Sequence, residues 1–265
     1  MKLVNETISS VQRNRATKTR IDAHPLAANL GAFIGLLPLV GYWISFKAFK
    51  SSTLPWKIAL ASEFICPTII YVQYILNRRA RRLFCEGIAA IAGLVPTWLA
   101  IGSYWLFYLG FAPMPFAPRV IALSICLAIT LIVIIVVLQN YRRATTRLNL
   151  VQRMDIMEPD TIVYPDTLDA GIPMFERSLS RLPTPPLWLF STVGSIGTAY
   201  AMVSGRVFET SGGPHILFIM LSVVSFPVSC AYIGHFFVRL GYFHIYLPLK
   251  LERDTGKKVI LGPWT

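Results

Sequence analysis

The sequence predicts an all-α integral membrane protein: a bundle of about six transmembrane helices with both termini in the cytoplasm and one longer cytoplasmic loop. Three observations predict it, namely an apolar composition, six stretches long enough to cross a bilayer, and positive charge that alternates between the connections. Hydrophobic residues make up 54% and charged residues 14% of the 265 residues, and mean hydropathy is +0.56. A soluble protein of this size needs more charge to cover its surface. The same composition excludes a disordered chain and a disulfide-rich secreted module.

Six stretches reach the roughly 20 apolar residues that a helix needs to cross a hydrocarbon core. They are residues 26–46, 57–76, 87–107, 120–139, 187–205 and 216–238. The fourth is the clearest, since it contains no charged residue and no proline, whereas the second contains Glu63 and Pro67. Open strands are excluded, because unsatisfied backbone groups are too costly in lipid.

The positive charge predicts the orientation of these helices. There are 25 Lys and Arg residues against 13 acidic residues, a net charge of +12. The segments outside the six spans fall alternately on the two sides of the membrane. Those on one side, which include both termini, hold 20 of the 25 cations, and those on the other side hold five. Because Lys and Arg are enriched in cytoplasmic segments, both termini are predicted to be cytoplasmic. A bacterial inner membrane fits this orientation; an Arg- and Ser-containing N-terminus leaves a mitochondrial presequence as the alternative.

The prediction divides the chain into five segments by their place relative to the bilayer. They are a basic cytoplasmic arm at 1–25, four helices at 26–139, a cytoplasmic loop at 140–186, two helices at 187–238 and a cytoplasmic tail at 239–265. The apolar run that begins the tail is too short to cross a bilayer. Its aromatic residues predict either a segment at the lipid headgroups or one that packs against the inner end of the bundle.

The loop at 140–186 is a candidate site for a partner or a cation, since it is longer than a simple connection needs. The candidate residues are acidic: Glu158, Asp160, Asp166 and Asp169. Their spacing lacks the pattern of a calcium loop, which favours a protein partner over a metal ion. The alternative is a solvated loop, in which a repeated Pro-Asp-Thr makes turns within an extended stretch.

Glu63 is the candidate functional residue inside the membrane, because an ionisable group is costly there. It lies roughly 10 Å from the outer end of its helix, and Pro67 removes the backbone donor that would bond its carbonyl. A carboxyl group in this position is expected to be protonated or paired. One hypothesis is an ion or proton pathway; the other is a neutral side chain bonded to Asn29 or Gln73 of the bundle.

Small residues at four-residue spacing predict close helix contacts. Gly31 and Gly35 form such a pair in the first helix. Gly197, Ala201 and Gly205 repeat the spacing in the fifth. Such faces let helices approach closely, and the sequence leaves open whether they serve the bundle or a homo-oligomer.

No catalytic or metal site is predicted. Phosphate-binding, zinc-protease and nucleophile-elbow motifs are absent from the sequence. The histidines have no ligand spacing, and no cofactor is expected. Glu86 follows Arg82 by four residues, the spacing of a helical ion pair. The basic residues lie between apolar spans, so a nucleic-acid partner is not expected either.

Three functions fit these features. The favoured hypothesis is a non-catalytic interaction or assembly component of the inner membrane, such as a secretion or conjugation accessory or an immunity-type protein. Its expected partners are the lipid bilayer and a protein that binds the loop and tail. The alternatives are a small solute or ion transporter that uses Glu63, and a membrane-embedded enzyme at the cytoplasmic face.

Overall fold

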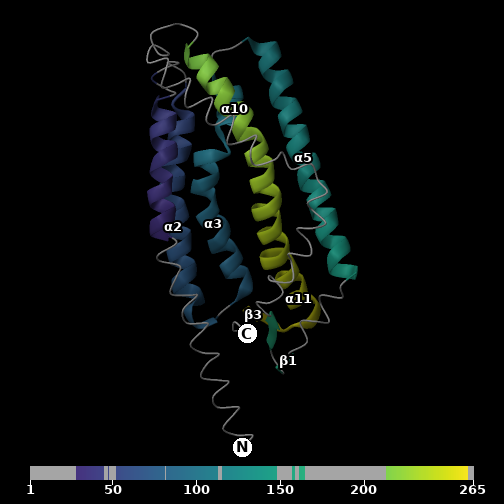
Figure 1. Ribbon diagram of the computed structural model, residues 1–265. Coiled ribbons are helices and arrows are strands. Elements are labelled where there is room, and N and C mark those ends of the chain that lie inside the picture. The colour runs from purple at the N-terminus through teal and green to yellow at the C-terminus, as the bar shows by residue number, and fades with distance from the viewer. Residues whose placement is uncertain are drawn as a thin grey trace, which may run out of the picture.

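The computed structural model describes residues 28–44, 47, 52–80, 82–112, 115–147, 157–158, 161–164 and 213–261 (Figure 1). The predicted arm at 1–25, the fifth span at 187–205 and most of the loop at 140–186 lie outside the described residues. The described helices are Ala28–Ile44, α2 (Leu54–Ala80), α3 (Leu83–Ile101), α4 (Tyr104–Phe111), α5 (Phe116–Arg147), α10 (Gly213–Tyr232) and α11 (Leu247–Thr255). Two π-helical segments, η1 (Ile233–Val238) and η2 (Gly241–Tyr246), join α10 to α11.

Four of the described helical stretches are long and apolar enough to cross a membrane. They are Leu54–Asn77, Leu83–Ile101, Phe116–Thr146 and Phe218–Thr255. Large apolar side chains cover the outside of these helices, as Ile75 at 70% exposure and Ile132 at 60% illustrate. Such a surface is unfavourable in water by about 25 cal/mol per Å² of apolar area, so the fold fits an integral membrane protein. The count of six spans stays a prediction.

One predicted span is interrupted. The sequence predicted a single helix at 87–107, but α3 ends at Ile101 and α4 begins at Tyr104. The Ser103 hydroxyl donates to the Leu99 carbonyl at 2.8 Å, which caps the end of α3. The backbone N–H of Trp105 donates to Ser225 Oγ of α10 at 3.0 Å. Hydroxyl groups therefore satisfy backbone groups that an unbroken helix would have paired.

A buried asparagine joins α2 to α3. Asn77 is 1% exposed; its Nδ2 donates to the Arg82 carbonyl at 3.1 Å, and its Oδ1 accepts from the Arg82 N–H at 2.6 Å. Arg82 is extended (φ −71°, ψ 129°) just before α3. Arg82 is thus the residue that caps the start of α3, and its carbonyl accepts the first-turn hydrogen bond from the Glu86 N–H at 3.5 Å. The ion pair of Arg82 with Glu86 stays a prediction.

We expect Asn77→Ala to destabilise the turn between α2 and α3. The change removes the acceptor of the Arg82 N–H and one of the two donors to the Arg82 carbonyl, which also accepts from the Glu86 N–H at 3.5 Å. Each lost hydrogen bond is worth about 0.5–1.5 kcal/mol. Thermal unfolding of the purified protein measures the loss. Thr68→Ala is the control, since the exposed Thr68 hydroxyl bonds only its own helix at Phe64. Equal melting temperatures for the two variants would contradict this role of Asn77.

The last helix is longer than predicted. The sequence ended the sixth span at residue 238, but the helical stretch continues from Phe218 to Thr255. It ends at Gly256, whose φ of 72° favours glycine. Tyr242 and Phe243 of η2 are buried and lie against Tyr141 of α5, with ring centroids 6.2 and 5.2 Å away. The start of the tail therefore packs against the bundle, which was one of the two alternatives that the sequence predicted.

A small sheet adds to the expected all-α fold. β1 (Met157–Glu158) pairs antiparallel with β2 (Thr161–Tyr164), and β2 pairs in parallel with β3 (Lys258–Leu261). A further antiparallel bridge joins Arg82 to Ile260. The loop after α5 and the tail therefore meet at one end of the bundle, called here the sheet end (Figure 1).

Candidate functional site

The first candidate site is the contact between Glu63 of α2 and Gly35 of the Ala28–Ile44 helix. The Glu63 carboxyl lies so close to Gly35 that a Cβ there would overlap its Oε2 and lie 2.7 Å from its Cδ. Only glycine leaves this space, so Gly35 admits the carboxyl group between the two helices. Gly31 also faces the bundle, since its nearest neighbour on that side is the Gly93 carbonyl of α3 at 3.9 Å. Within the described residues this glycine pair serves the bundle.

The polar residues predicted to share this site do not come together. Asn29 Oδ1 accepts a hydrogen bond from the Tyr71 hydroxyl at 3.1 Å. Gln73 lies ten residues after Glu63 on α2, which is about 15 Å along the helix. Among the described residues, Glu63 Oε2 and Gln73 Oε1 are buried and have no hydrogen-bond partner. None of these observations supports a bond from Glu63 to Asn29 or Gln73, and that hypothesis stays a prediction.

We expect Gly35→Ala to displace the Glu63 carboxyl group and to be less stable than Gly31→Ala. The new Cβ overlaps the flexible end of the Glu63 side chain, and moving that side chain offsets the gain of about 1 kcal/mol for alanine over glycine in a helix. Gly31→Ala is the matched control, because its Cβ finds an ordinary van der Waals contact. Thermal unfolding compares the two variants, and a Gly31→Ala variant as unstable as Gly35→Ala would contradict the contact.

The second candidate site is the sheet-end core, a buried cluster that joins five separate parts of the chain. Its members are Leu83, Val137, Tyr141, Ile162, Tyr164, Tyr242, Phe243, Leu247, Leu251 and Val259. Val259 of β3 is fully buried, and its N–H donates to Glu252 Oε1 of α11 at 3.0 Å. Strand, tail helix and bundle therefore form one folded unit.

Two ionisable side chains are buried beside this core. Glu86 is 6% and His244 5% exposed. The ring centroids of His244 and Tyr164 lie 6.2 Å apart. A Cβ on Gly87 would lie 2.8 Å from His244 Cβ, so α3 and η2 pack in close contact here. The sequence did not predict that both side chains are buried.

The acidic candidates of the loop are only partly placed. The backbone of Glu158 lies in β1, while Asp160, Asp166 and Asp169 lie outside the described residues. So do Gly197, Ala201 and Gly205 of the fifth span. Within the described ranges, no group of three or more His, Cys, Asp or Glu side chains is placed to hold a metal ion.

Sequence reasoning missed the residues that build the sheet-end core. Ile162 and Val259 are register partners in β2 and β3, which are separated by the rest of the loop and the last two predicted spans. The β-branched and aromatic residues of Thr161–Tyr164 were the available signal. At four residues it is too short to distinguish a strand from a loop.

The fold and these two sites define a helical protein with candidate membrane-spanning helices and a small sheet at one end of its bundle. The chain matches no protein-family model, no curated protein and no solved structure. The sites themselves therefore carry the functional argument.

Proposed function

We propose that the protein is a non-catalytic interaction or assembly component of a bacterial inner membrane, which binds a protein partner at its sheet end. The observation that carries the proposal is the sheet-end core, in which β2, from the loop after α5, and the tail form one folded unit. A connection or a disordered tail would not need this buried core. The proposal places the sheet end and both termini in the cytoplasm, in agreement with the charge bias of the sequence.

The surface of the sheet end supports a partner with an acidic face. Exposed cations surround the core: Arg142, Arg143, Lys250, Arg253 and Lys258. Complementary charge steers association and fixes the register of an interface. The edges of a three-stranded sheet also offer backbone groups for an added strand.

Charge reversal tests this proposal without disturbing the core. We expect Lys250→Glu combined with Arg253→Glu to abolish partner cross-linking in native membranes, as read by mass spectrometry. Lys57→Glu is the control, since Lys57 is exposed at the other end of α2. Both variants should insert and melt like the wild type. A partner that cross-links equally to both variants, or no partner beyond background in wild-type membranes, would contradict the proposal.

A second candidate function is transport of a small solute or ion through Glu63. One observation favours it: the buried Oε2 has no partner among the described residues, and a bound proton or cation would provide one. Saturable flux into proteoliposomes that fails in Glu63→Gln would support transport. Wild-type vesicles as tight as empty ones across cations and small solutes would reject it.

A further inference from the structure

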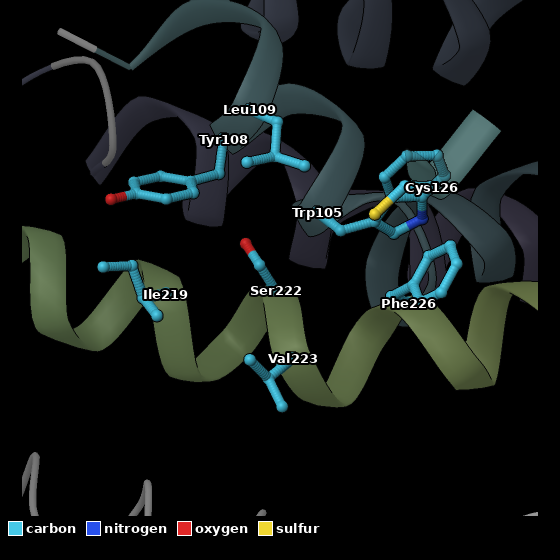
Figure 2. Close-up of a pocket in the computed structure, with 8 residues that line it drawn as sticks. All are labelled: Trp105, Tyr108, Leu109, Cys126, Ile219, Ser222, Val223 and Phe226. Carbon is cyan, nitrogen blue, oxygen red and sulfur yellow. The ribbon is translucent and has the colours of Figure 1, made fainter. Parts of the chain in front are cut away.

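An apolar groove lies between α4, α5 and α10, away from both sites described above. Its volume is about 310 Å³, within the range of small-molecule sites. Figure 2 shows Trp105 and Tyr108 on one side, Ser222 and Val223 of α10 on the other, and Cys126 of α5 at one end. Val223 is 61% exposed, so the groove opens onto the outer face of the bundle. That face carries exposed Ile and Leu side chains and fits a lipid environment.

The groove holds a hydrogen-bond donor that lacks an acceptor. Trp105 is 2% exposed, and its Nε1 has no hydrogen-bond partner among the described residues. In Figure 2 this nitrogen lies on the side of Cys126 and Phe226. A buried, unsatisfied N–H costs about 1–3 kcal/mol. The comparable Trp98 Nε1 donates to Ser229 Oγ at 2.9 Å, so an indole inside this bundle can be satisfied where an acceptor is supplied.

A cation lies on the same side of α5 as the groove. Arg119 precedes Cys126 by seven residues, which is two helical turns, or about 10 Å, on one face. The charge bias predicts that only five of the 25 cations, Arg119 among them, lie on the outer side of the membrane. The cytoplasmic excess of Lys and Arg that sets the orientation of the helices therefore does not account for Arg119. A guanidinium group binds phosphate through paired hydrogen bonds.

We propose that the groove binds one anionic phospholipid of the surrounding bilayer. One acyl chain lies against Val223 and Phe226, and the phosphate lies at Arg119. Because Trp105 Nε1 is buried, the Phe226 side chain rotates on binding and lets an ester carbonyl accept the hydrogen bond of this nitrogen. The bilayer supplies all three parts in one molecule: an apolar chain, an uncharged acceptor and an anion, in order toward the membrane surface. This site is independent of the partner proposed for the sheet end.

Two pairs of variants test the groove, each with a control on the same kind of surface. Arg119→Gln removes the cation, and Lys57→Gln removes an exposed cation that does not line the groove. Val223→Trp fills the groove, and Ile132→Trp adds the same ring to an exposed position of α5 outside it. Each protein is reconstituted in nanodiscs of equal phosphatidylglycerol and phosphatidylethanolamine, extracted gently, and weighed by native mass spectrometry.

The wild type and both controls should retain one phosphatidylglycerol. In Arg119→Gln the ratio of retained phosphatidylglycerol to phosphatidylethanolamine should fall about tenfold, the loss expected for one charge-assisted hydrogen bond. Val223→Trp should retain no lipid. Three outcomes would overturn the proposal: a wild type that retains no lipid, equal headgroup preference in Arg119→Gln and Lys57→Gln, or cross-links from Cys126 to residues 187–205 that show another helix in the groove.

Discussion

Replacing Gly87 with alanine is expected to separate α3 from η2 and to destabilise the protein markedly. The new Cβ would lie 2.8 Å from His244 Cβ, 2.9 Å from Ile245 Cγ1 and 3.1 Å from the His244 backbone carbon. One of these atoms belongs to the backbone, so a side-chain rotation cannot relieve the overlap. Overpacking costs about 1–3 kcal/mol, which exceeds or cancels the gain of about 1 kcal/mol for alanine over glycine in a helix.

Gly93→Ala is the matched control for this prediction. Gly93 lies in the same helix, but its nearest neighbour for a Cβ is Ile70 Cδ1 at 3.8 Å, an ordinary contact. We expect this variant to melt at or above the wild-type temperature, since it keeps the helix-propensity gain without the overlap. If both variants shift the melting temperature alike, the close contact between α3 and η2 is not formed.

Replacing Tyr164 with alanine is expected to release the loop from the sheet-end core while leaving the bundle folded. Tyr164 is 1% exposed, and removing a buried aromatic ring costs about 3–5 kcal/mol. That loss exceeds what a four-residue strand can retain through its backbone pairing alone. Limited trypsin digestion reads the release, because Arg153 and Arg177 flank the strand in the sequence.

Tyr246→Ala is the control for the loop, since Tyr246 is an aromatic residue of η2 that is 49% exposed. It should leave the rate of cleavage in the loop near that of the wild type. Equal rates for Tyr164→Ala and Tyr246→Ala would show that β2 is not anchored by Tyr164.

The membrane class followed from the sequence because hydropathy and length alone decide it. Where a helix ends is harder to predict, since tertiary contacts decide it. Apolar residues suitable for lipid end near Val238, yet the helix continues because Tyr242 and Phe243 are buried against Tyr141. The break at residues 102–103 depends on Ser225, a residue of another helix. Neither contact leaves a local pattern in the sequence.

In the candidate sites, too, local features could be predicted from the sequence, whereas contacts between helices could not. Glu63 and Gly35 were each predicted from their own helix, by charge and by spacing, but that they meet depends on how the two helices are aligned. Trp105 was unremarkable as one of several aromatic residues near a helix end. Its unpartnered nitrogen becomes evident only when α4, α5 and α10 are placed together.

The claim that the loop and the tail form one unit is tested most directly by a cross-link between β2 and β3. Thr161 and Lys258 are register partners. Neighbouring strands lie about 4.8 Å apart, within the reach of a disulfide. The four native cysteines are first replaced by alanine, and Thr161→Cys is combined with Lys258→Cys in native membranes. The control pair, Thr161→Cys with Ile260→Cys, is two residues out of register, at about 8 Å.

We predict that oxidation joins positions 161 and 258 far faster than 161 and 260, read as a shift in gel mobility that reductant reverses. β2 would then lie beside β3 with Thr161 opposite Lys258, and the sheet end would be one folded surface. Absence of the 161–258 cross-link, or equal rates for the two pairs, would contradict the pairing of β2 with β3 on which the sheet end depends.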